Sequence, residues 1–105
     1  MPYEGMRLIA RSTVVEYAAK YPATAAALAH WLTVVKAATW QNMSEAANAF
    51  SRAKSVSGDR IRYDFVGGDY RMIVAFDFGH QIAFVKFIGT HAEYDKIDAA
   101  TVSLF

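Results

Sequence analysis

Two apolar runs in the C-terminal half decide the fold. They are residues 70–77, YRMIVAFD, and residues 81–88, QIAFVKFI, with the residues FGH between them. Both runs are rich in β-branched and aromatic residues and have the length of a strand. Because so short a turn joins neighbouring strands, the sequence predicts an antiparallel pair. After Gln81, the second run is apolar except at Lys86, which is typical of a central strand covered on most of both faces.

A further strand precedes this pair. In residues 60–65, RIRYDF, apolar and polar side chains alternate, which predicts a strand with one buried and one wet face. Residues 67–69, GGD, supply the hairpin turn to the next strand. Residues 51–59, which contain Ser57-Gly58-Asp59, are expected to form a loop.

The N-terminal half has helical spacing instead. A short apolar run at residues 6–10 predicts a strand, and Ser12 is the expected N-cap of a helix from Thr13 to Tyr21 that Pro22 ends. A second helix is predicted over residues 24–38, and a shorter one after Ser44. The apolar stripe of the second helix consists of Leu28, Trp31, Leu32 and Val35.

This segregation of helices and strands predicts an α+β domain, with an N-terminal strand and two helices packed on a small antiparallel sheet. At 105 residues and 54% hydrophobic content, the chain fits a single domain over residues 1–105. We expect residues 1–5 to be an extension that precedes the domain. The chain contains no cysteine, which excludes disulfides and thiolate zinc sites and fits a cytoplasmic protein. No segment is long and apolar enough to span a bilayer, so no membrane partner is expected.

Residues 87–96, FIGTHAEYDK, contain several groups that can transfer protons or bind phosphates, and these groups directly follow the last predicted strand in the sequence. Thr90 and Glu93 fit a capping box, so a short helix is predicted to begin at His91. His91 is a candidate general acid or base; the alternative is a turn histidine that bonds the backbone. Tyr94 is a candidate for positioning a phosphate; the alternative is a packing tyrosine with its hydroxyl in water.

Cations interrupt the apolar strands at Arg71 and Lys86. A charge in such a strand must be paired, reach water or face a ligand, and Arg71 could simply pair with Asp64 or Asp77. If the strand register aligns Arg71 and Lys86 with a third cation, Arg62, the three would form a phosphate-binding surface. The nearby basic residues form a small patch, whose alternative reading is a solvated loop and strand edge; they are Arg52, Lys54, Arg60 and Arg62.

Metal or cofactor binding is not expected. The histidines at positions 30, 80 and 91 are scattered and follow no metal-binding spacing. Neither His30 nor His80 has titratable neighbours in the sequence that suggest a site.

Two segments resemble the HigB-type toxins of type II toxin–antitoxin systems. Residues 89–97, GTHAEYDKI, resemble the C-terminal signature of that family, and residues 65–73, FVGGDYRMI, resemble its hairpin with the strand arginine. Trp40 and the start at residues 6–9, MRLI, fit as well, so that the resemblance runs from Met6 to about Ala99. The sequence departs from the family at Asp69, where asparagine is frequent, and in its formal net charge of only +1.

The resemblance implies a microbial-ribonuclease-like fold related to the RelE toxins. It also implies an mRNA interferase that cuts translated messages on the ribosome. A HigA-type antitoxin with a helix-turn-helix domain would neutralise it. Cleavage would proceed by attack of the ribose 2′-OH on the adjacent phosphate, without a metal. Arg71 would hold the phosphate and its developing charge, His91 would act as acid or base, and Tyr94 and Lys86 would orient the phosphate or support proton transfer. The expected contacts to the RNA backbone are Lys54, Arg60, Arg62 and Lys96.

Two other readings of the residues remain open. The first is a toxin-like module that binds RNA or the ribosome without cutting. The second is a small α+β ligand-binding or dimerisation domain, in which Thr90 to Asp95 serve only as a helix cap.

Overall fold

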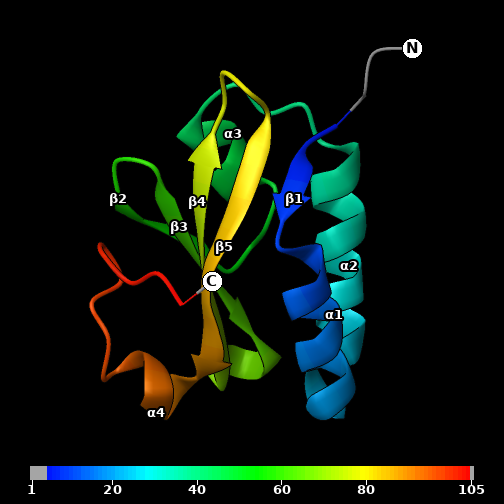
Figure 1. Ribbon diagram of the computed structural model, residues 1–105, viewed down its shortest axis with the longest axis vertical. Coiled ribbons are helices and arrows are strands. Elements are labelled where there is room, and N and C mark those ends of the chain that lie inside the picture. Colours follow the sequence, from blue (N-terminus) through cyan, green and yellow to red (C-terminus); the bar gives the residue numbers. More distant parts are fainter. Residues whose placement is uncertain (1–4, 105) are drawn as a thin grey trace.

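The computed structural model describes residues 5–104, so residues 1–4 of the expected N-terminal extension lie outside the described part (Figure 1). Strands and helices follow one another as β1 (Arg7–Ile9), α1 (Arg11–Lys20), a 3-10 turn (Pro22–Thr24), α2 (Ala25–Ala37), α3 (Met43–Asn48), β2 (Ala53–Ser57), β3 (Arg60–Phe65), a 3-10 turn (Val66–Gly68), β4 (Tyr70–Asp77), β5 (Ile82–Thr90) and α4 (His91–Tyr94). The prediction of an α+β domain is confirmed.

The strands of the described residues form one five-stranded sheet in the order β1-β5-β4-β3-β2. Neighbouring strands from β2 to β5 are antiparallel, and for β3, β4 and β5 the short turns between them predicted this. The N-terminal strand departs from the prediction of a purely antiparallel sheet, because β1 runs parallel to β5, with Leu8 opposite Ala83. Helices α1 to α3 and strands β2 to β4 lie between β1 and β5 in the sequence, so no local turn signal indicates this pairing.

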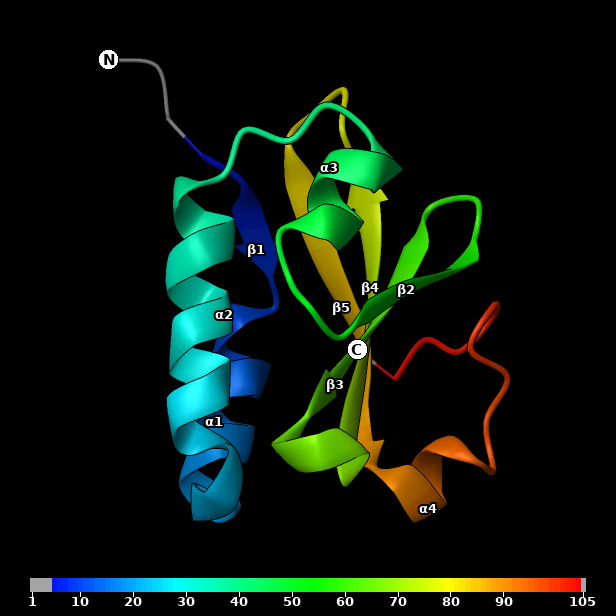
Figure 2. The same cartoon turned by 180° about the vertical axis from the view of Figure 1, so that it is seen from behind.

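Helices α1 and α2 lie side by side along one flank of the molecule, while α4 and the C-terminal segment lie on the opposite flank (Figures 1 and 2). The main core lies between the helices and one face of the sheet. Trp31 of α2 is fully buried and meets Tyr63 of β3 edge to face, with ring centroids 5.5 Å apart. Buried Met72 and Val85 continue this face across β4 and β5.

The opposite face of the sheet is also largely covered. Ile73 and Phe87 are paired across β4 and β5, and both are buried. The C-terminal segment is fastened to this side: Nη1 of Arg60 donates to the carbonyls of Ala99 and Val102, at 3.1 and 2.6 Å. The amide of Leu104 donates to the carbonyl of Lys86 at 2.9 Å. Both faces of the central strands are therefore protected from water, which explains their nearly continuous apolar sequence.

Two local predictions are wrong. Helix α1 begins at Arg11 with Ala10 as its N-cap and no side-chain cap, so Ser12 lies inside the helix. The expected loop at residues 51–59 contains the edge strand β2, whose pairing with β3 sets Lys54 opposite Arg62. Strand β2 lies at the edge of the sheet and has no buried residue, so it needs no apolar alternation. By contrast, α3 begins close to its predicted place, capped by Asn42, which accepts from the Glu45 amide.

Candidate functional site

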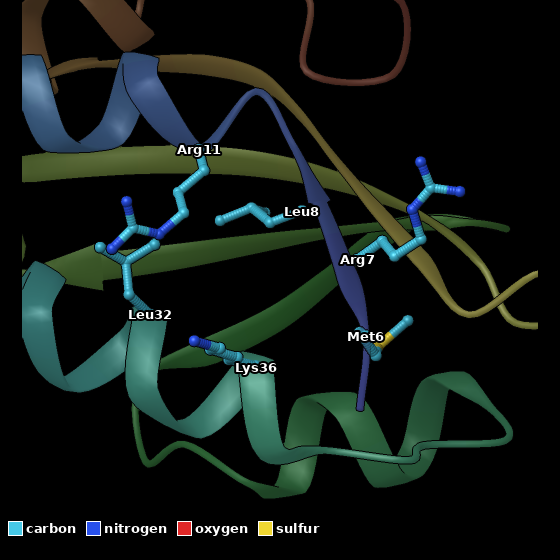
Figure 3. A pocket seen from close by; sticks show the side chains of 6 residues that line it. All are labelled: Met6, Arg7, Leu8, Arg11, Leu32 and Lys36. Atoms are coloured by element: carbon cyan, nitrogen blue, oxygen red, sulfur yellow. The ribbon is translucent and has the colours of Figure 1, made fainter. Parts of the chain in front are cut away.

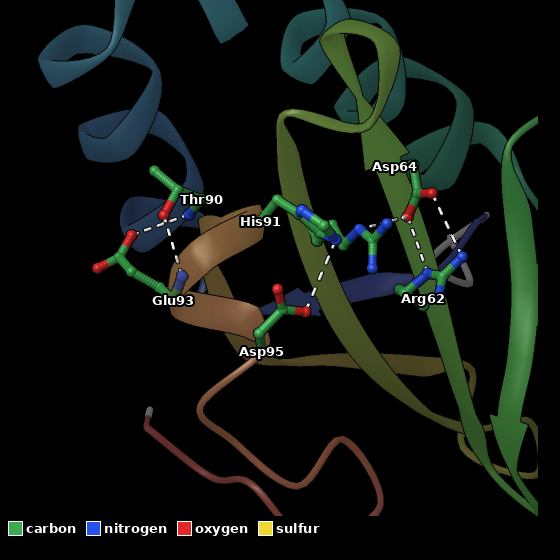
Figure 4. Close-up of polar contacts among 7 residues, drawn as sticks. Arg62, Asp64, Thr90, His91, Glu93 and Asp95 are labelled. Carbon is green, nitrogen blue, oxygen red and sulfur yellow. Dashed lines mark hydrogen bonds and ion pairs between the residues drawn. The ribbon is translucent and has the colours of Figure 1, made fainter.

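The predicted capping box is present at the end of β5. The Thr90 hydroxyl accepts from the Glu93 amide at 3.2 Å, and a Glu93 carboxylate oxygen accepts from the Thr90 amide at 2.8 Å (Figure 4). The amide of His91 donates to the carbonyl of Asp69 at 2.8 Å, which fastens α4 to the turn before β4. Three hydrogen bonds thus hold the backbone where β5 ends and α4 begins.

The side chain of His91 projects from this fixed backbone. It is 51% exposed, and its Nε2 lies 3.6 Å from Oδ1 of Asp95, one helical turn later. In the view of Figure 4, His91 and Asp95 lie between the capping box and a pair formed by Arg62 and Asp64. An exposed imidazole on a rigid backbone, beside a carboxylate that can orient it, suits a general acid or base.

A compact ion cluster occupies strands β3 and β4. Asp64 accepts from Nε of Arg62 at 2.9 Å and from Nη2 at 3.3 Å, so this pair is bidentate. The same carboxylate lies 3.7 Å from Nε of Arg71, its partner in the register of the two strands. Of the two expected partners of Arg71, Asp64 is therefore the one found. Two guanidinium groups share one carboxylate, which leaves the cluster with a positive charge.

Tyr94 of α4 closes this cluster. Its ring centroid is 4.9 Å from Cζ of Arg71 and 5.7 Å from Cζ of Arg62, both within the range of cation–π attraction. The ring also packs edge to face on Phe87 at 6.2 Å. Burial alone would lower the pKa of the Arg62 guanidinium, but its interactions with Tyr94 and Asp64 raise that pKa above its ordinary value. Arg62 thus stays charged, and it belongs to the same cluster as Arg71.

Gly89 makes room for this arrangement. It lies opposite Arg71 in the register of β4 and β5. A Cβ atom at this position would lie 2.8 Å from Cζ of Phe87 and 3.1 Å from Oε1 of Glu93. A larger residue would therefore push on both the ring under Tyr94 and the carboxylate of the capping box. Neither this glycine nor the role of Asp64 as a shared counter-ion was among the predicted site residues, because both depend on the strand register.

The other predicted cations lie around this cluster. Lys54 is exposed and stands opposite Arg62 in the sheet, and Lys96 is exposed just after α4. Lys86 lies further along β5, with its amine 5.3 Å from the Phe84 ring, and it lines a shallow cleft together with Arg60. The structure does not place Lys86 in the Arg62–Asp64–Arg71 cluster, and the guanidinium of Arg60 is bonded to the C-terminal segment.

His80 has one titratable neighbour, Asp77, but the pair that they form does not belong to the candidate site. Its Nδ1 lies 2.8 Å from Oδ2 of Asp77 in the exposed turn between β4 and β5. The hydrogen bonds from His80 lower the pKa of Asp77 below its ordinary value. This pair is at the opposite end of β4 from Arg71, so it lies apart from the candidate site.

Within residues 5–104, no three histidine or acidic side chains are grouped so that they could hold a metal ion. None of the helices in the same part of the chain is long and apolar enough to cross a membrane.

Comparison with known proteins gives this fold and site a class. A model of the HigB toxin family, described as the RelE-like toxic component of a toxin–antitoxin system, matches residues 24–97. The mRNA interferase HigB of Escherichia coli O6:H1 is 33% identical over 94 residues, which cover 88% of this chain and 91% of that protein. The chain thus has the sequence of a RelE-like toxic component. It belongs to the HigB toxin family, as the two signature segments predicted.

Proposed function

We propose that this chain is an mRNA interferase, an endoribonuclease that cuts translated messages on the ribosome without a metal. One observation carries the proposal. The Arg62–Asp64–Arg71 cluster, closed by Tyr94, sits beside a short helix that begins with an exposed histidine. The similarity to an E. coli mRNA interferase supports the same reaction.

The proposed reaction is an internal transesterification. The 2′-oxygen of one ribose attacks the adjacent phosphorus, the bond from phosphorus to the 5′-oxygen breaks, and a 2′,3′-cyclic phosphate and a 5′-hydroxyl result. This step needs a base at the 2′-OH, donors for the charge on the phosphate oxygens, and an acid at the leaving oxygen. The reaction needs no further reactant, because the bonds that form and break belong to the RNA and only protons are exchanged.

Arg71 and Arg62 are the proposed phosphate ligands. Each presents a planar guanidinium, and the positive charge that Asp64 leaves uncompensated is available to a phosphate. Tyr94, which both arginines flank, would orient the phosphate or support proton transfer. His91 would act as acid or base, with Asp95 orienting its ring.

The remaining cations are assigned to the RNA backbone. Lys54 and Lys96 are exposed, and Lys86 and Arg60 lie further along the sheet, where they would meet flanking phosphates. Each such contact would make binding weaker as salt increases. The partners in this proposal are messenger RNA, the ribosome and a HigA-type antitoxin with a helix-turn-helix domain, all in the cytoplasm.

The test is induction of the chain without antitoxin in a bacterium, followed by mapping of new 5′ ends by primer extension. Two reporter messages are compared, one translated and one with its start codon removed. The proposal predicts cuts inside the translated message only, with 2′,3′-cyclic phosphate at the upstream ends. Growth arrest without new 5′ ends would indicate that the chain blocks ribosomes instead of cutting messages. Cuts in both messages would show that cleavage does not need the ribosome.

A further inference from the structure

A groove lies between β1, α1 and α2, on the flank away from α4. Its volume is about 390 Å³, and its lining residues are Met6, Arg7, Leu8, Arg11, Leu32 and Lys36 (Figure 3). No part of the Arg62–Asp64–Arg71 cluster lines this groove, and α4 lies on the opposite flank of the molecule in both overall views (Figures 1 and 2). The groove therefore has no role in the proposed cleavage reaction.

The base of the groove is apolar. Met6 is buried, and Leu8 and Leu32 are half-buried at the edge of the main core. Leu8 belongs to β1, Met6 directly precedes that strand, and Leu32 belongs to α2. Apolar surface that faces a concave opening, rather than a convex exterior, is the usual receptor for an apolar side chain of a partner.

The rim is cationic. Arg7, Arg11 and Lys36 are all exposed, and none of them takes part in an ion pair with the residues from 5 to 104. Arg11 is the first residue of α1, and the first turn of that helix contains no acidic residue. The positive end of the helix dipole therefore adds to the charge of Arg11 at the mouth of the groove.

The groove is built into the fold. Gly5 lies against the end of α2 with φ of +90°, and a Cβ atom on it would collide with the carbonyl oxygen of Lys36. Only glycine combines this close approach with a positive φ at little cost. The chain leading into β1 is thereby seated on α2, which fixes the distance between the Arg7 and Lys36 sides of the rim.

We propose that this groove binds an acidic segment of the antitoxin, which inserts an apolar side chain over Leu8 and Leu32 and sets carboxylates against the cationic rim. The proposal rests on the pairing with an antitoxin that membership of a toxin–antitoxin family implies, and not on the cleavage reaction. The three cations of the rim complement carboxylates, and the apolar floor of the groove complements an apolar side chain, so a peptide with both groups fits.

Single-stranded RNA is the other polyanion that the rim could attract. RNA-binding grooves combine cations with aromatic rings on which bases stack. The lining of this groove contains no aromatic residue, and its base offers aliphatic side chains instead. The chemistry therefore favours an acidic peptide, and RNA binding becomes an outcome of the test.

The test uses the whole chain with the substitution His91→Ala, so that toxin can be purified without its antitoxin, and the cognate antitoxin as the probe. Three changes address the rim and base: the double change Arg7→Glu with Arg11→Glu, the single change Lys36→Glu, and Leu32→Ala. Lys20→Glu is the matched control, because Lys20 is exposed at the other end of α1 and does not line the groove. Thermal melts confirm that each variant is folded.

The proposal predicts that the rim variants bind the antitoxin roughly 10-fold to 100-fold more weakly than the control and with less dependence on salt. Leu32→Ala should weaken binding without changing the salt dependence. In cells with His91 intact, rim variants should still arrest growth, but co-expressed antitoxin should no longer relieve the arrest. Unchanged antitoxin affinity would overturn the proposal.

Toxicity separates the remaining outcomes. If folded rim variants bind antitoxin normally but lose toxicity, the groove contacts RNA or the ribosome and the proposal is wrong. If the chain with His91 intact is not toxic at all, the proposed cleavage function fails, while the affinity measurement on the purified proteins still decides the question of the groove.

Discussion

Asp64 and Arg71 face each other across β3 and β4, with Oδ1 of the carboxylate 3.7 Å from Nε of the guanidinium. The same carboxylate forms a bidentate pair with Arg62. Their side chains are only 14–22% exposed, so the pairing is shielded from bulk water. Asp64 thus holds two arginines in place while neutralising only one of them, which explains how a chain with a net charge of +1 can keep a local positive site.

Asp64→Asn should separate the positioning of the two arginines from the binding of RNA. Asparagine keeps the shape of the side chain but removes the charge that orients both arginines. We expect a loss of stability of about 1–3 kcal/mol, since a hydrogen-bonded charge loses its partner. RNA affinity should be kept or increased, because net positive charge rises, whereas the cleavage rate constant should fall. Separate measurements of kcat and KM on a model message test this; an unchanged kcat would contradict the role given to Asp64.

Arg71→Lys keeps the charge and removes the planar fork. We expect cleavage to fall by about 10²–10³, the cost typical of losing one donor to a developing oxyanion. Arg71→Ala should be at least as severe. Arg52→Lys serves as the control, since Arg52 is an exposed cation ahead of β2 and outside the cluster. Primer extension on a translated message measures the rates, and wild-type cleavage by Arg71→Lys would remove Arg71 from the mechanism.

Arg60 has a structural task in addition to its proposed contact with RNA. Because its guanidinium donates to the carbonyls of Ala99 and Val102, Arg60→Ala should release the C-terminal segment from the sheet. We expect a stability loss of about 1.5–3 kcal/mol and faster hydrogen exchange at the Leu104 amide, which bonds to Lys86. If exchange at Leu104 is unchanged and only RNA affinity falls, the anchoring role is wrong.

Tyr17 should make the fold sensitive to alkali. Burial, helped by the charge of Glu93, raises the pKa of its hydroxyl to about 12, and that hydroxyl has no hydrogen-bond partner among residues 5–104. Below the ordinary tyrosine pKa of about 10 this group costs no ionisation energy in either state. As pH rises from about 10 to about 12, the unfolded chain loses the proton first, so stability falls. Tyr17→Phe should reduce that fall.

Urea unfolding of the wild type and Tyr17→Phe at pH 8 and at pH 11 measures the effect. At pH 8 the variant should be as stable as the wild type or slightly more stable, because no buried hydroxyl remains unpaired. Equal losses of stability in the two proteins between these pH values would show that Tyr17 does not titrate on unfolding.

The sequence allowed the central sheet to be predicted because its patterns are local. Alternation in residues 60–65 and the apolar runs on either side of residue 79 correspond to β3, β4 and β5 within about two residues. The capping box of Thr90 and Glu93 is likewise contained in four consecutive residues. The toxin family was indicated by short segments from the same region and is confirmed by the comparisons.

What could not be predicted depends on contacts between distant segments. β2 has only one large apolar residue, Val56, so it lacks the pattern of a half-buried strand. The membership of Arg62 in the cluster follows from the register that aligns β3 with β4 and from the fold of α4 against β5. Lys86 could not be separated from Arg71 for the same reason, since both simply interrupt apolar runs in the sequence.

The proposed cleavage depends on His91, and a comparison with His80 isolates the contribution of His91. His91→Ala and His80→Ala each remove an exposed histidine that lies near a carboxylate, at opposite ends of the sheet. The two variants are induced separately, and new 5′ ends on a translated message are mapped by primer extension. We predict that cuts persist with His80→Ala and fall by about 10²–10⁴ with His91→Ala, the contribution of a general acid or base. Undiminished cutting by a folded His91→Ala protein would exclude His91 from the cleavage reaction.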